Sequence, residues 1–525
     1  MSNHSQEKTN SGSWLNNLSA WDKLAGIIFG LTSAVTLWLL GTVISLNMLP
    51  TLYLGVVIVL VVLFLFAIFK TLFANKKKDK KGQESAGMIR LLGLVLALAL
   101  VLVDAVGISM VSKLHGTLTN IGNDGEEVVY EIVGLYVRND DSAQKLEDVA
   151  AYSTGYSYAY DRDTMETAME KMTKSVENSL DFKQFESDLV AVDALLAGEV
   201  NAVLLNVGYI SVMEGLEGYI DIDSRIRLVH EFQMVDEDAN NVIINEDTKP
   251  KDITEEPFIV YVSGNDSNYS SKKQRSDVNI LAVVNPVTKQ VVLINTPRDY
   301  YVELVGSGKG DGKRDKLTHC GNFGVECSML TLGELYDQDI HYYARINFKG
   351  FTNMVDAVGG VTVYSEKEFR TYTGALVKKG DNYMDGETAL SFVRERYAFA
   401  DGDNARGRHQ MAVIKAIIKK AASGAIITRY GDILDAMGSS FSTNLTNEEM
   451  SNLVKMQLGD MASWNIQSFS VLGKGNGGKE YTFSIPNQKV YVAYVNDTYV
   501  DHAKSLIDKV FAGEEITEAD LTIAQ

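Results

Sequence analysis

Three long apolar runs dominate the first part of the hydrophobic pattern, at residues 24–46, 52–69 and 91–111. The first two contain no charged residue and the third is interrupted only by Asp104, so each is long enough to cross a hydrocarbon core about 30 Å thick. A cleaved signal peptide would not be followed by two further spans. We therefore predict three transmembrane helices. Asp104 falls in the outer half of its span, where we expect an interfacial or helix-packing role, with a functional intramembrane carboxylate as the alternative.

The basic residues between these runs predict their orientation. Residues 75–90 hold five lysines and Arg90, whereas the connection "NMLPT" before the second run carries no charge. Because basic loops stay in the cytoplasm, residues 1–23 and the loop 75–90 are predicted to be cytoplasmic. Three spans then place everything after about residue 112 outside, as the large extracellular part of a multi-pass protein of the cell membrane.

Short alternating segments replace the long runs between residues 128 and 250. β-Branched and aromatic runs at 128–137, 155–160, 202–210 and 226–234 are typical of strands, and those at 142–150, 163–172 and 185–198 are typical of helices. This alternation predicts a small α/β accessory domain, in which no nucleophile or metal-ligand cluster is evident. The polar, turn-rich stretch 236–257 is typical of a linker.

Two β-rich runs follow the linker and are joined by the turn-forming "NPVTK". Folding this hairpin about residues 286–288 brings residues 275–277 opposite 297–299. One strand end would thus gather Arg275, Asp277, Arg298 and Asp299, with Asp266 near by. Paired carboxylates beside arginines suit a divalent cation that bridges phosphate oxygens. Ordinary salt bridges at a strand end are the alternative for this segment.

A second group of arginines lies in "RERYAFADGDNARGRHQ", residues 394–410. Arginine presents a planar fork that matches phosphate or carboxylate, although a solvated charged surface is the alternative. In the helix predicted after residue 402, Arg406 and Gln410 are four residues apart and share a face. Arg408 lies about 200° around that helix from Arg406, so we expect it to face solvent.

Charge and cysteine content narrow the functional classes. The chain has a formal net charge of −19, and because residues 1–112 carry +4, the part predicted to be extracellular carries −23. So acidic a surface repels nucleic acid and excludes a nucleic-acid-binding protein. Cys320 and Cys327 both lie in this part, where they can form a disulfide or remain two free thiols. We predict the disulfide.

Six blocks of sequence resemble the LytR-CpsA-Psr family over roughly residues 255–425: "RSDVNILAVVNP", "LINTPRDYYV", "DKLTH", "INFKGFTNMVDAVGGV", "DGETALSFVRERY" and "GDNARGRHQ". The three spans and the additional α/β domain are similar to the capsule-associated CpsA branch. The resemblance implies an extracellular α/β domain at 255–515, with a central mixed β-sheet flanked by helices. It also implies a phosphotransferase that moves a glycopolymer, here capsular polysaccharide, from a polyprenyl-pyrophosphate carrier to peptidoglycan. Capsule-assembly membrane proteins are further partners to be expected.

The same resemblance assigns roles position by position. Asp266 and Asp277 are expected to bind Mg²⁺ or Mn²⁺, and Arg298, Asp299 and Arg396 to be catalytic. The pyrophosphate is expected to contact Arg275, Arg298, Lys316, Arg394, Arg396, Arg406 and Gln410. Family sequences commonly read Arg-x-x-Arg-Gln where this chain has "RGRHQ". His409 is therefore expected to replace an arginine in part, as a weaker and pH-dependent donor.

Three classes of function are compatible with these residues. The leading prediction is transfer of the glycopolymer to peptidoglycan, which needs mainly positioning and charge stabilisation and no covalent nucleophile. Water in place of the acceptor hydroxyl would make the protein a polyprenyl-pyrophosphate hydrolase. A non-catalytic membrane regulator of capsule synthesis is the third class, and the full set of carboxylates and arginines argues against it.

Overall fold

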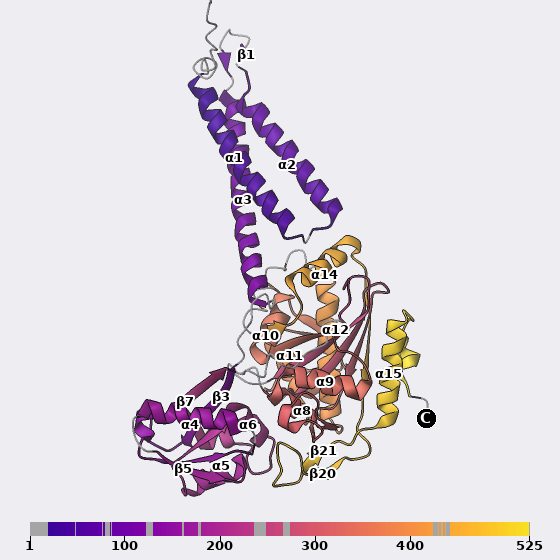
Figure 1. Ribbon diagram of the computed structural model, residues 1–525. Coiled ribbons are helices and arrows are strands. Elements are labelled where there is room, and N and C mark those ends of the chain that lie inside the picture. Colours follow the sequence, from indigo (N-terminus) through magenta and orange to yellow (C-terminus); the bar gives the residue numbers. More distant parts are fainter. Residues whose placement is uncertain are drawn as a thin grey trace, which may run out of the picture. The chain divides into compact units, whose positions relative to one another are not determined.

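The computed structural model of the chain (Figure 1) describes residues 19–47, 49–75, 77–78, 84–85, 87–121, 130–159, 162–176, 180–235, 248–265, 274–423, 429, 432–433, 436 and 441–523. Two compact units divide the chain. One comprises residues 1–118 with 448–460, and the other comprises residues 119–447 with 461–525.

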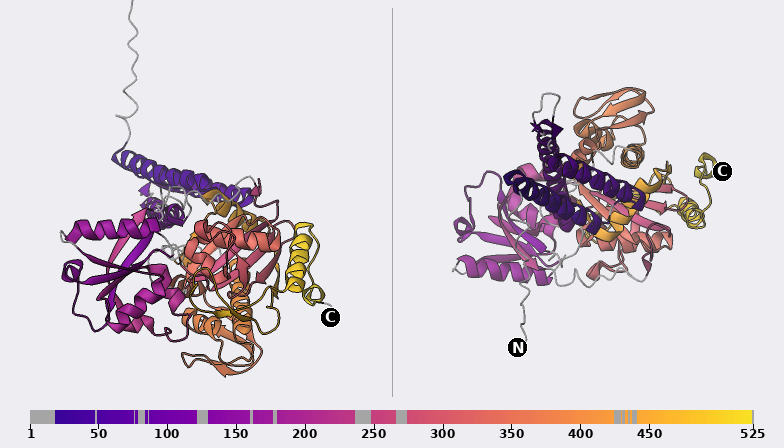
Figure 2. Two further views of the ribbon diagram at one scale, coloured as in Figure 1. Left: turned by 60° about the horizontal axis from the view of Figure 1, so that its bottom comes forward. Right: turned by 90° about the horizontal axis from the view of Figure 1, so that it is seen from above.

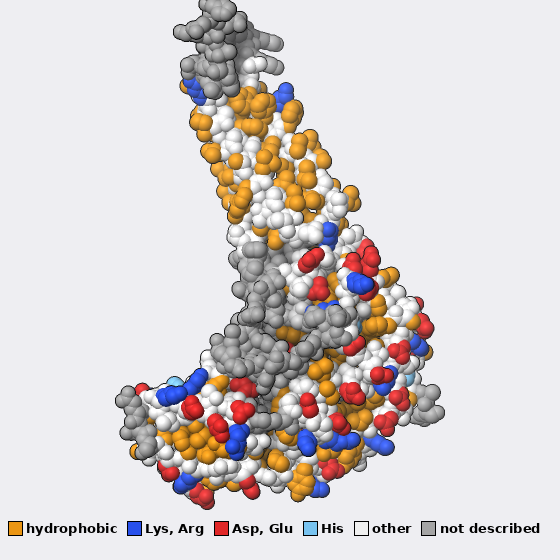
Figure 3. All heavy atoms as spheres, viewed as in Figure 1, with side chains coloured by type: hydrophobic (Ala, Val, Ile, Leu, Met, Phe, Trp, Pro, Cys, Tyr) orange, Lys and Arg blue, Asp and Glu red, His pale blue; other side chains and the backbone are white. Residues whose placement is uncertain are grey.

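Three helices that are long and apolar enough to cross a membrane make up most of the first unit. The elements of this unit are α1 (Ala20–Ser45), α2 (Thr51–Leu72), β1 (Lys77–Lys78), β2 (Glu84–Ser85), α3 (Gly87–Ile121) and α14 (Asn447–Asp460). Exposed Leu, Val, Ile and Phe side chains cover the three long helices (Figure 3), as contact with lipid tails would favour. The three predicted apolar helices are confirmed.

Asp104 lies inside this helix bundle. It is 2% exposed, and its Oδ2 accepts a hydrogen bond of 2.6 Å from the Thr36 hydroxyl on α1. A carboxylate without a partner is costly in hydrocarbon, so this bond satisfies one oxygen and links α3 to α1. The contact supports the helix-packing role expected for Asp104 and supplies the partner that the sequence did not identify.

Residues 130–235 form a five-stranded mixed sheet with helices on both faces (Figure 2). The strand order is β5-β4-β6-β3-β7, with β4 parallel to β5 and β6, and β3 antiparallel to β6 and β7. Its elements are β3 (Tyr130–Arg138), β4 (Ser153–Ser157), α4 (Arg162–Val176), β5 (Asp181–Phe185), α5 (Asp188–Ala197), β6 (Ala202–Asn206), α6 (Val207–Met213), α7 (Ile222–Arg225) and β7 (Ile226–Val235). The predicted α/β region is confirmed.

Three details of this region differ from the sequence pattern. The run 142–150, expected to be a helix, forms only a short 3-10 turn, Leu146–Val149. The strand predicted to run from 202 to 210 ends at Asn206, because the Asn206 side chain accepts a hydrogen bond of 2.9 Å from the Gly208 amide and caps α6. The edge strand β5 was not predicted, because its sequence "DFKQF" is mostly polar and no residue in it is fully buried. The short helix α6 reaches the candidate active site.

A six-stranded mixed sheet forms the centre of the remaining residues, in the order β18-β13-β8-β9-β10-β19. Its strands are β8 (Phe258–Asn265), β9 (Val278–Asn285), β10 (Gln290–Asn295), β13 (Tyr342–Asn347), β18 (Phe441–Thr443) and β19 (Asn465–Ser470). The pairs β13–β8 and β10–β19 are parallel and the others are antiparallel. This arrangement confirms the predicted mixed sheet.

Helices cover both faces of this sheet. Leu281 and Val283 pack on one face with residues of α9 and α15, whereas Ile280 and Ala282 pack on the other face with Met411 of α12. Because successive strand residues point to opposite faces, two buried faces explain the continuous apolar run "ILAVV". The helices are α8 (Leu317–Cys320), α9 (Val325–Tyr336), α10 (Phe348–Ala357), α11 (Gly386–Arg394), α12 (Asp403–Ala421) and α15 (Asp497–Phe511). Four small two-stranded antiparallel sheets pair β11 (Tyr301–Glu303) with β12 (Arg314–Lys316), β14 (Val361–Ser365) with β17 (Gly380–Met384), β15 (Phe369–Arg370) with β16 (Leu376–Val377), and β20 (Gly478–Glu480) with β21 (Val490–Val492).

The predicted hairpin forms between β9 and β10, and its register differs by one residue from a fold centred on residue 287. Asn285 pairs with Gln290 at the turn, and Ile280 pairs with Asn295 at the open end. Continuing this pairing by three residues places Asp277 opposite Arg298. The open end of the hairpin therefore brings the two predicted site segments together.

Cys320 and Cys327 are two free, buried thiols in the hydrophobic core, which differs from the predicted disulfide. The Cys320 Sγ lies 3.7 Å from the Thr331 hydroxyl. The neighbouring Cys320 thiol and burial raise the pKa of Cys327 well above its ordinary value. Both side chains thus fill core volume between α8 and α9 as unreactive thiols.

Gly407 in the first turns of α12 lies directly against the end of β10. A Cβ atom added to Gly407 would lie 2.3 Å from the Asn295 side-chain nitrogen, closer than non-bonded atoms approach. The absence of a side chain at this position lets the N-terminal end of α12 approach the open end of the hairpin. Arg406, the preceding residue, is carried there with it.

We expect Gly407→Ala to lower the thermal unfolding midpoint by at least about 3 °C, because one methyl group overpacks this contact by about 1–3 kcal/mol. In an open helix the same change is stabilising by up to about 1 kcal/mol. Gly459→Ala in α14 is the matched control, since nothing lies within 4 Å of its added Cβ. Thermal unfolding of the full chain in detergent measures both, and equal midpoints for the two variants would contradict the packing argument.

Candidate active site

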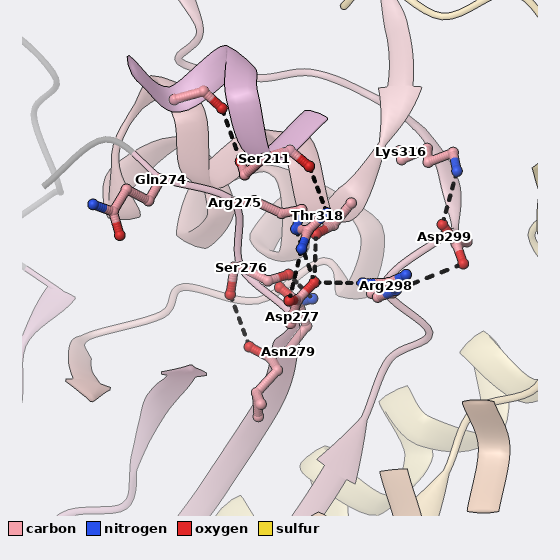
Figure 4. Close-up of polar contacts among 12 residues, drawn as sticks. Ser211, Gln274, Arg275, Ser276, Asp277, Asn279, Arg298, Asp299, Lys316 and Thr318 are labelled. Carbon is pink, nitrogen blue, oxygen red and sulfur yellow. Dashed lines mark hydrogen bonds and ion pairs between the residues drawn. The ribbon is translucent and has the colours of Figure 1, made fainter. Parts of the chain in front are cut away.

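Asp277 is the centre of a buried group of charges at the start of β9 (Figure 4). Its Oδ1 accepts a hydrogen bond of 2.6 Å from Arg298 Nη1 and lies 3.2 Å from Arg275 Nε, while its Oδ2 accepts from Arg275 Nη2 at 3.3 Å. The Asp277 side chain is only 14% exposed. Burial alone would raise the pKa of Asp277, but the positive charges of Arg275, Arg298 and Arg406 hold it well below its usual range. This carboxylate is therefore ionised at any physiological pH.

Asp299 is the second carboxylate of the group. Its Oδ1 accepts a hydrogen bond of 3.0 Å from Lys316 Nζ, and its Oδ2 lies 3.8 Å from Arg298 Nε. Burial would raise the pKa of Asp299, and the charges of Arg298 and Lys316 lower it below its ordinary value. Arg298 thus bridges two carboxylates, one on each side of its guanidinium (Figure 4).

Arg406 joins this group from the first turn of α12. Its side chain is 12% exposed and pairs with Asp403, and its charge is close enough to lower the pKa values of both Asp277 and Asp299. Burial lowers the pKa of Arg406 itself. Gln410 lies one turn further along α12 and is half-buried. Arg408 pairs instead with Asp401 at 2.6 Å and Glu366 at 3.5 Å, away from the group, as its position on the helix predicted.

Arg394 and Arg396 are exposed and bind aromatic rings instead of the buried carboxylates. The Arg394 guanidinium stacks over Phe348 at 4.4 Å and donates to the Tyr372 hydroxyl at 3.0 Å, and Arg396 lies over its neighbour Tyr397. The residue between them, Glu395, is buried, and its Oε1 accepts hydrogen bonds from the backbone amides of Tyr397 and Ala398. The structure therefore brings together Arg275, Asp277, Arg298, Asp299, Lys316 and Arg406. Arg394 and Arg396 instead contact aromatic side chains, although Arg396 is close enough to lower the pKa of Arg406.

Of the two expected metal ligands, Asp277 lies in this group of charges and Asp266 lies outside the described residues. Among the described residues no group of three or more acidic, histidine or cysteine side chains could hold a metal on its own. Asp277 and Asp299 nevertheless supply two carboxylates with lowered pKa values, on either side of Arg298. This donor set fits Mg²⁺, which is commonly held by one or two carboxylates together with substrate phosphates.

Comparison with known proteins identifies the region that carries these charges. The model of the LytR_cpsA_psr family matches residues 227–497, about half of the chain. A teichoic acid transferase TagU of Bacillus cereus (strain AH820) is 36% identical over 238 residues, which cover 45% of this chain and 75% of the relative. The chain belongs to the LytR-CpsA-Psr family.

Other similar proteins are also teichoic acid transferases. The relative from Bacillus mycoides (strain KBAB4) is 35% identical over 238 residues, with the same coverage of both chains. Both relatives are named polyisoprenyl-teichoic acid–peptidoglycan teichoic acid transferases. The crystal structure of B. subtilis TagU is 26% identical, with a TM-score of 0.39, and the match covers 50% of this chain and 100% of TagU.

Several residues of this LytR-CpsA-Psr site were not predicted from sequence. The Thr318 hydroxyl lies 3.4 Å from Asp277 Oδ1, and its backbone donates to the Arg298 carbonyl and accepts from the Ser276 amide. Thr318 is part of the quoted "DKLTH", so that motif was the available signal. Tyr491 is half-exposed, and the pKa of its hydroxyl is raised by burial and by the charges of Asp299 and Asp403. No local pattern marks Tyr491 or Ser211, whose carbonyl accepts a hydrogen bond of 2.6 Å from Arg275 Nη1.

His409 does not replace the missing family arginine, which corrects the expectation from "RGRHQ". Its ring is 7% exposed and stacks on Phe392 with centroids 4.1 Å apart, and the rings of Phe369 and Phe399 also contact it. Burial, with a smaller contribution from Arg408, lowers the pKa of His409 to about 4. The side chain is therefore a neutral member of the core below α12.

This burial predicts a pH-dependent stability that His409→Phe removes. As the pH falls below about 6.5, His409 becomes protonated in the unfolded chain, but in the folded chain it stays neutral until about pH 4. The free energy of unfolding therefore decreases between these two pH values. We expect the wild type to lose on the order of 2 kcal/mol more than His409→Phe between pH 7 and pH 4. Thermal unfolding at a series of pH values measures the difference, and parallel curves for the two proteins would show that His409 is not buried in neutral form.

Proposed function

We propose that this chain is a phosphotransferase that moves a glycopolymer from a polyprenyl-pyrophosphate carrier to peptidoglycan at the outer face of the membrane. The observation that carries the proposal is the pair of buried carboxylates, Asp277 and Asp299, bridged by Arg298 and surrounded by three further cations. The transferase names of the relatives support the same reaction. We assign residues 255–515 as the catalytic domain and residues 128–250 as an accessory domain.

Arg298 and Arg406 provide the forks that would hold the pyrophosphate, with Arg275 and Lys316 beside them. In the transfer, the oxygen of the acceptor hydroxyl bonds to the phosphorus that carries the glycan, and the bond from that phosphorus to the bridging oxygen breaks. The hydroxyl proton passes, directly or through water, to the polyprenyl phosphate that is released. Negative charge spreads over the phosphoryl oxygens in such a transition state, and preorganised guanidinium groups stabilise it. The lowered pKa values of Asp277 and Asp299 make both weak bases, which suits them to placing cations.

Mg²⁺ or Mn²⁺, when bound, would neutralise phosphate charge, and Asp277 and Asp299 are the described residues that would hold it. Asp266 is a further candidate ligand from the sequence. We also propose Arg394 and Arg396 as outer contacts for the carrier or glycan, because both are exposed and Arg396 is close enough to lower the pKa of Arg406. Gln410, one turn from Arg406, is proposed as a contact to the same phosphates.

The lysine-rich loop 75–90 supports an orientation with the N-terminus inside and the catalytic domain outside. Capsular polysaccharide is the polymer that we propose, because three spans and an accessory domain are similar to the capsule-associated branch of the family. The names of the relatives favour teichoic acid, and the assay below includes both. Capsule-assembly membrane proteins are the partners that this choice implies.

The fate of the glycan tests the function. The full-length protein is reconstituted with a lipid-linked glycan, either capsular or teichoic, and peptidoglycan oligomers. We expect the glycan to become joined to peptidoglycan through a phosphodiester. Release of the glycan with its phosphate would show a hydrolase, and glycan left on the lipid would show a protein without catalysis.

Exchange of Arg406 for lysine is expected to lower the transfer rate at least tenfold, or about 1.4 kcal/mol of transition-state stabilisation. Lysine keeps the charge and loses the two-pronged contact. Arg408→Lys is the matched control two residues away, and it should change the rate less than twofold because Arg408 pairs with Asp401. Equal losses in the two variants would show that the assignment of helix faces is wrong.

Asp277→Asn is expected to abolish stimulation of the reaction by Mg²⁺, because a hard cation needs the anionic oxygen. It should also cost about 3 kcal/mol or more of stability, since Arg275 and Arg298 would lose their buried counter-charge. The initial rate as a function of Mg²⁺ concentration measures the first effect, with the exposed Asp508→Asn on α15 as the control. A variant with normal stimulation by Mg²⁺ would remove Asp277 from the ligand set.

A further inference from the structure

We propose that the accessory domain, residues 130–235, is a positioning element of the active site, which fixes the guanidinium of Arg275 through α6 and thereby sets the affinity of the site for pyrophosphate. This inference rests on the proposed function, because it takes Arg275 as one of the residues that bind pyrophosphate. It gives the accessory domain a role in the same reaction.

The direct contact is between α6 and Arg275 (Figure 4). Arg275 Nη1 donates to the Ser211 carbonyl at 2.6 Å, while its Nε and Nη2 lie 3.2 and 3.3 Å from the Asp277 carboxylate. A guanidinium group is planar and rigid, so a carbonyl on one side and a carboxylate on the other determine its plane. Arg275 is 9% exposed, which leaves it little freedom to leave this position.

The Ser211 carbonyl is suited to this contact because it lies in the last turn of α6. The Gly215 amide donates to the Val212 carbonyl and the Glu214 amide to the Ile210 carbonyl, which leaves the Ser211 oxygen to accept from Arg275. Carbonyls at a helix C-terminus carry partial negative charge and favour a cation. The accessory domain thus supplies a second hydrogen-bond acceptor for Arg275, in addition to the Asp277 carboxylate.

Residues 482–490 anchor the accessory domain, at α6 and at the start of α5, to the catalytic domain. The Tyr209 hydroxyl on α6 donates to the Ser484 carbonyl at 3.3 Å, and Asn487 Nδ2 donates to the Ser187 hydroxyl at 2.6 Å. Ile485 and Val490 are buried in the hydrophobic core of the accessory domain. The position of α6, and with it the Ser211 carbonyl, therefore depends on this anchoring segment.

The same segment leads to the second carboxylate of the site. Asp315 is completely buried, and its Oδ2 accepts hydrogen bonds from the Ser484 amide at 2.9 Å and the Ser484 hydroxyl at 2.5 Å. Its Oδ1 lies 2.6 Å from His319 Nδ1. The next residue, Lys316, holds Asp299 at 3.0 Å. The contacts of the accessory domain consequently reach both sides of Arg298.

The accessory-domain residues in these contacts lie outside the part of the chain that the family model matches, which begins at residue 227. Ser187, Tyr209 and Ser211 all precede it. The contact is therefore an addition by the accessory domain to a site whose charged residues lie in the matched part.

The test is a double-mutant cycle on binding of inorganic pyrophosphate with Mg²⁺ to the full-length protein in detergent, followed by calorimetry. One change, Tyr209→Phe with Asn487→Ala, removes both anchoring side-chain hydrogen bonds without touching the site. The other change, Arg275→Lys, keeps the charge and loses the guanidinium plane. Tyr219→Phe is the matched control, because it removes a tyrosine hydroxyl from the same domain where the hydroxyl bonds to Asp193.

We expect the anchoring pair of changes to weaken pyrophosphate binding at least fivefold, and Tyr219→Phe less than twofold. In the Arg275→Lys protein the anchoring pair should change binding less than twofold, because it acts through the guanidinium. An unchanged affinity in the wild-type background would overturn the inference, and so would equal weakening in both backgrounds, which would indicate a general loss of structure. A wild-type protein that binds no pyrophosphate would overturn the proposed function as well, so the two failures are distinguishable.

Discussion

The contact of Arg298 with two buried carboxylates is the interaction on which the rest of the site depends. Asp277, Arg298 and Asp299 are each less than a fifth exposed, and taking such charges out of water is costly unless each finds a partner. The surrounding residues meet that requirement. Arg275 and Lys316 complete the pairing of the two carboxylates, and Thr318 connects the chain segments that carry them.

The chain concentrates cations in one place although its predicted extracellular part carries −23. Exposed arginines would attract any anion, whatever its charge or shape. Arg298 and Arg406 are instead buried against Asp277, Asp299 and Asp403, so an incoming anion must compete with carboxylates that already occupy the forks. A pyrophosphate, with more charge than a single carboxylate, is suited to that competition, and Arg394 and Arg396 remain exposed for outer contacts.

Sequence reasoning predicted those parts of the fold and the site that local patterns determine. The apolar runs determine the three helices, and the hairpin turn brings the segments 275–277 and 297–299 opposite each other, because register follows from turn position to within a residue. The positions of Arg394 and His409 were not predictable in this way. Arg394 is held by Phe348 and Tyr372, and His409 by three phenylalanines, all of them distant in sequence or on other elements. Ser211 and Arg275 are 64 positions apart and belong to regions built on two different sheets. Their contact therefore could not be predicted from the spacing of residues in the sequence.

The position of a bound pyrophosphate tests the central claim most directly. A crystal structure of the full-length protein with inorganic pyrophosphate and Mg²⁺ should show phosphate oxygens at hydrogen-bond distance, about 2.7–3.2 Å, from Arg298 and Arg406, with the metal on Asp277. Pyrophosphate bound only by the exposed Arg394 and Arg396, with Arg298 still bridging Asp277 and Asp299 undisturbed, would contradict the account.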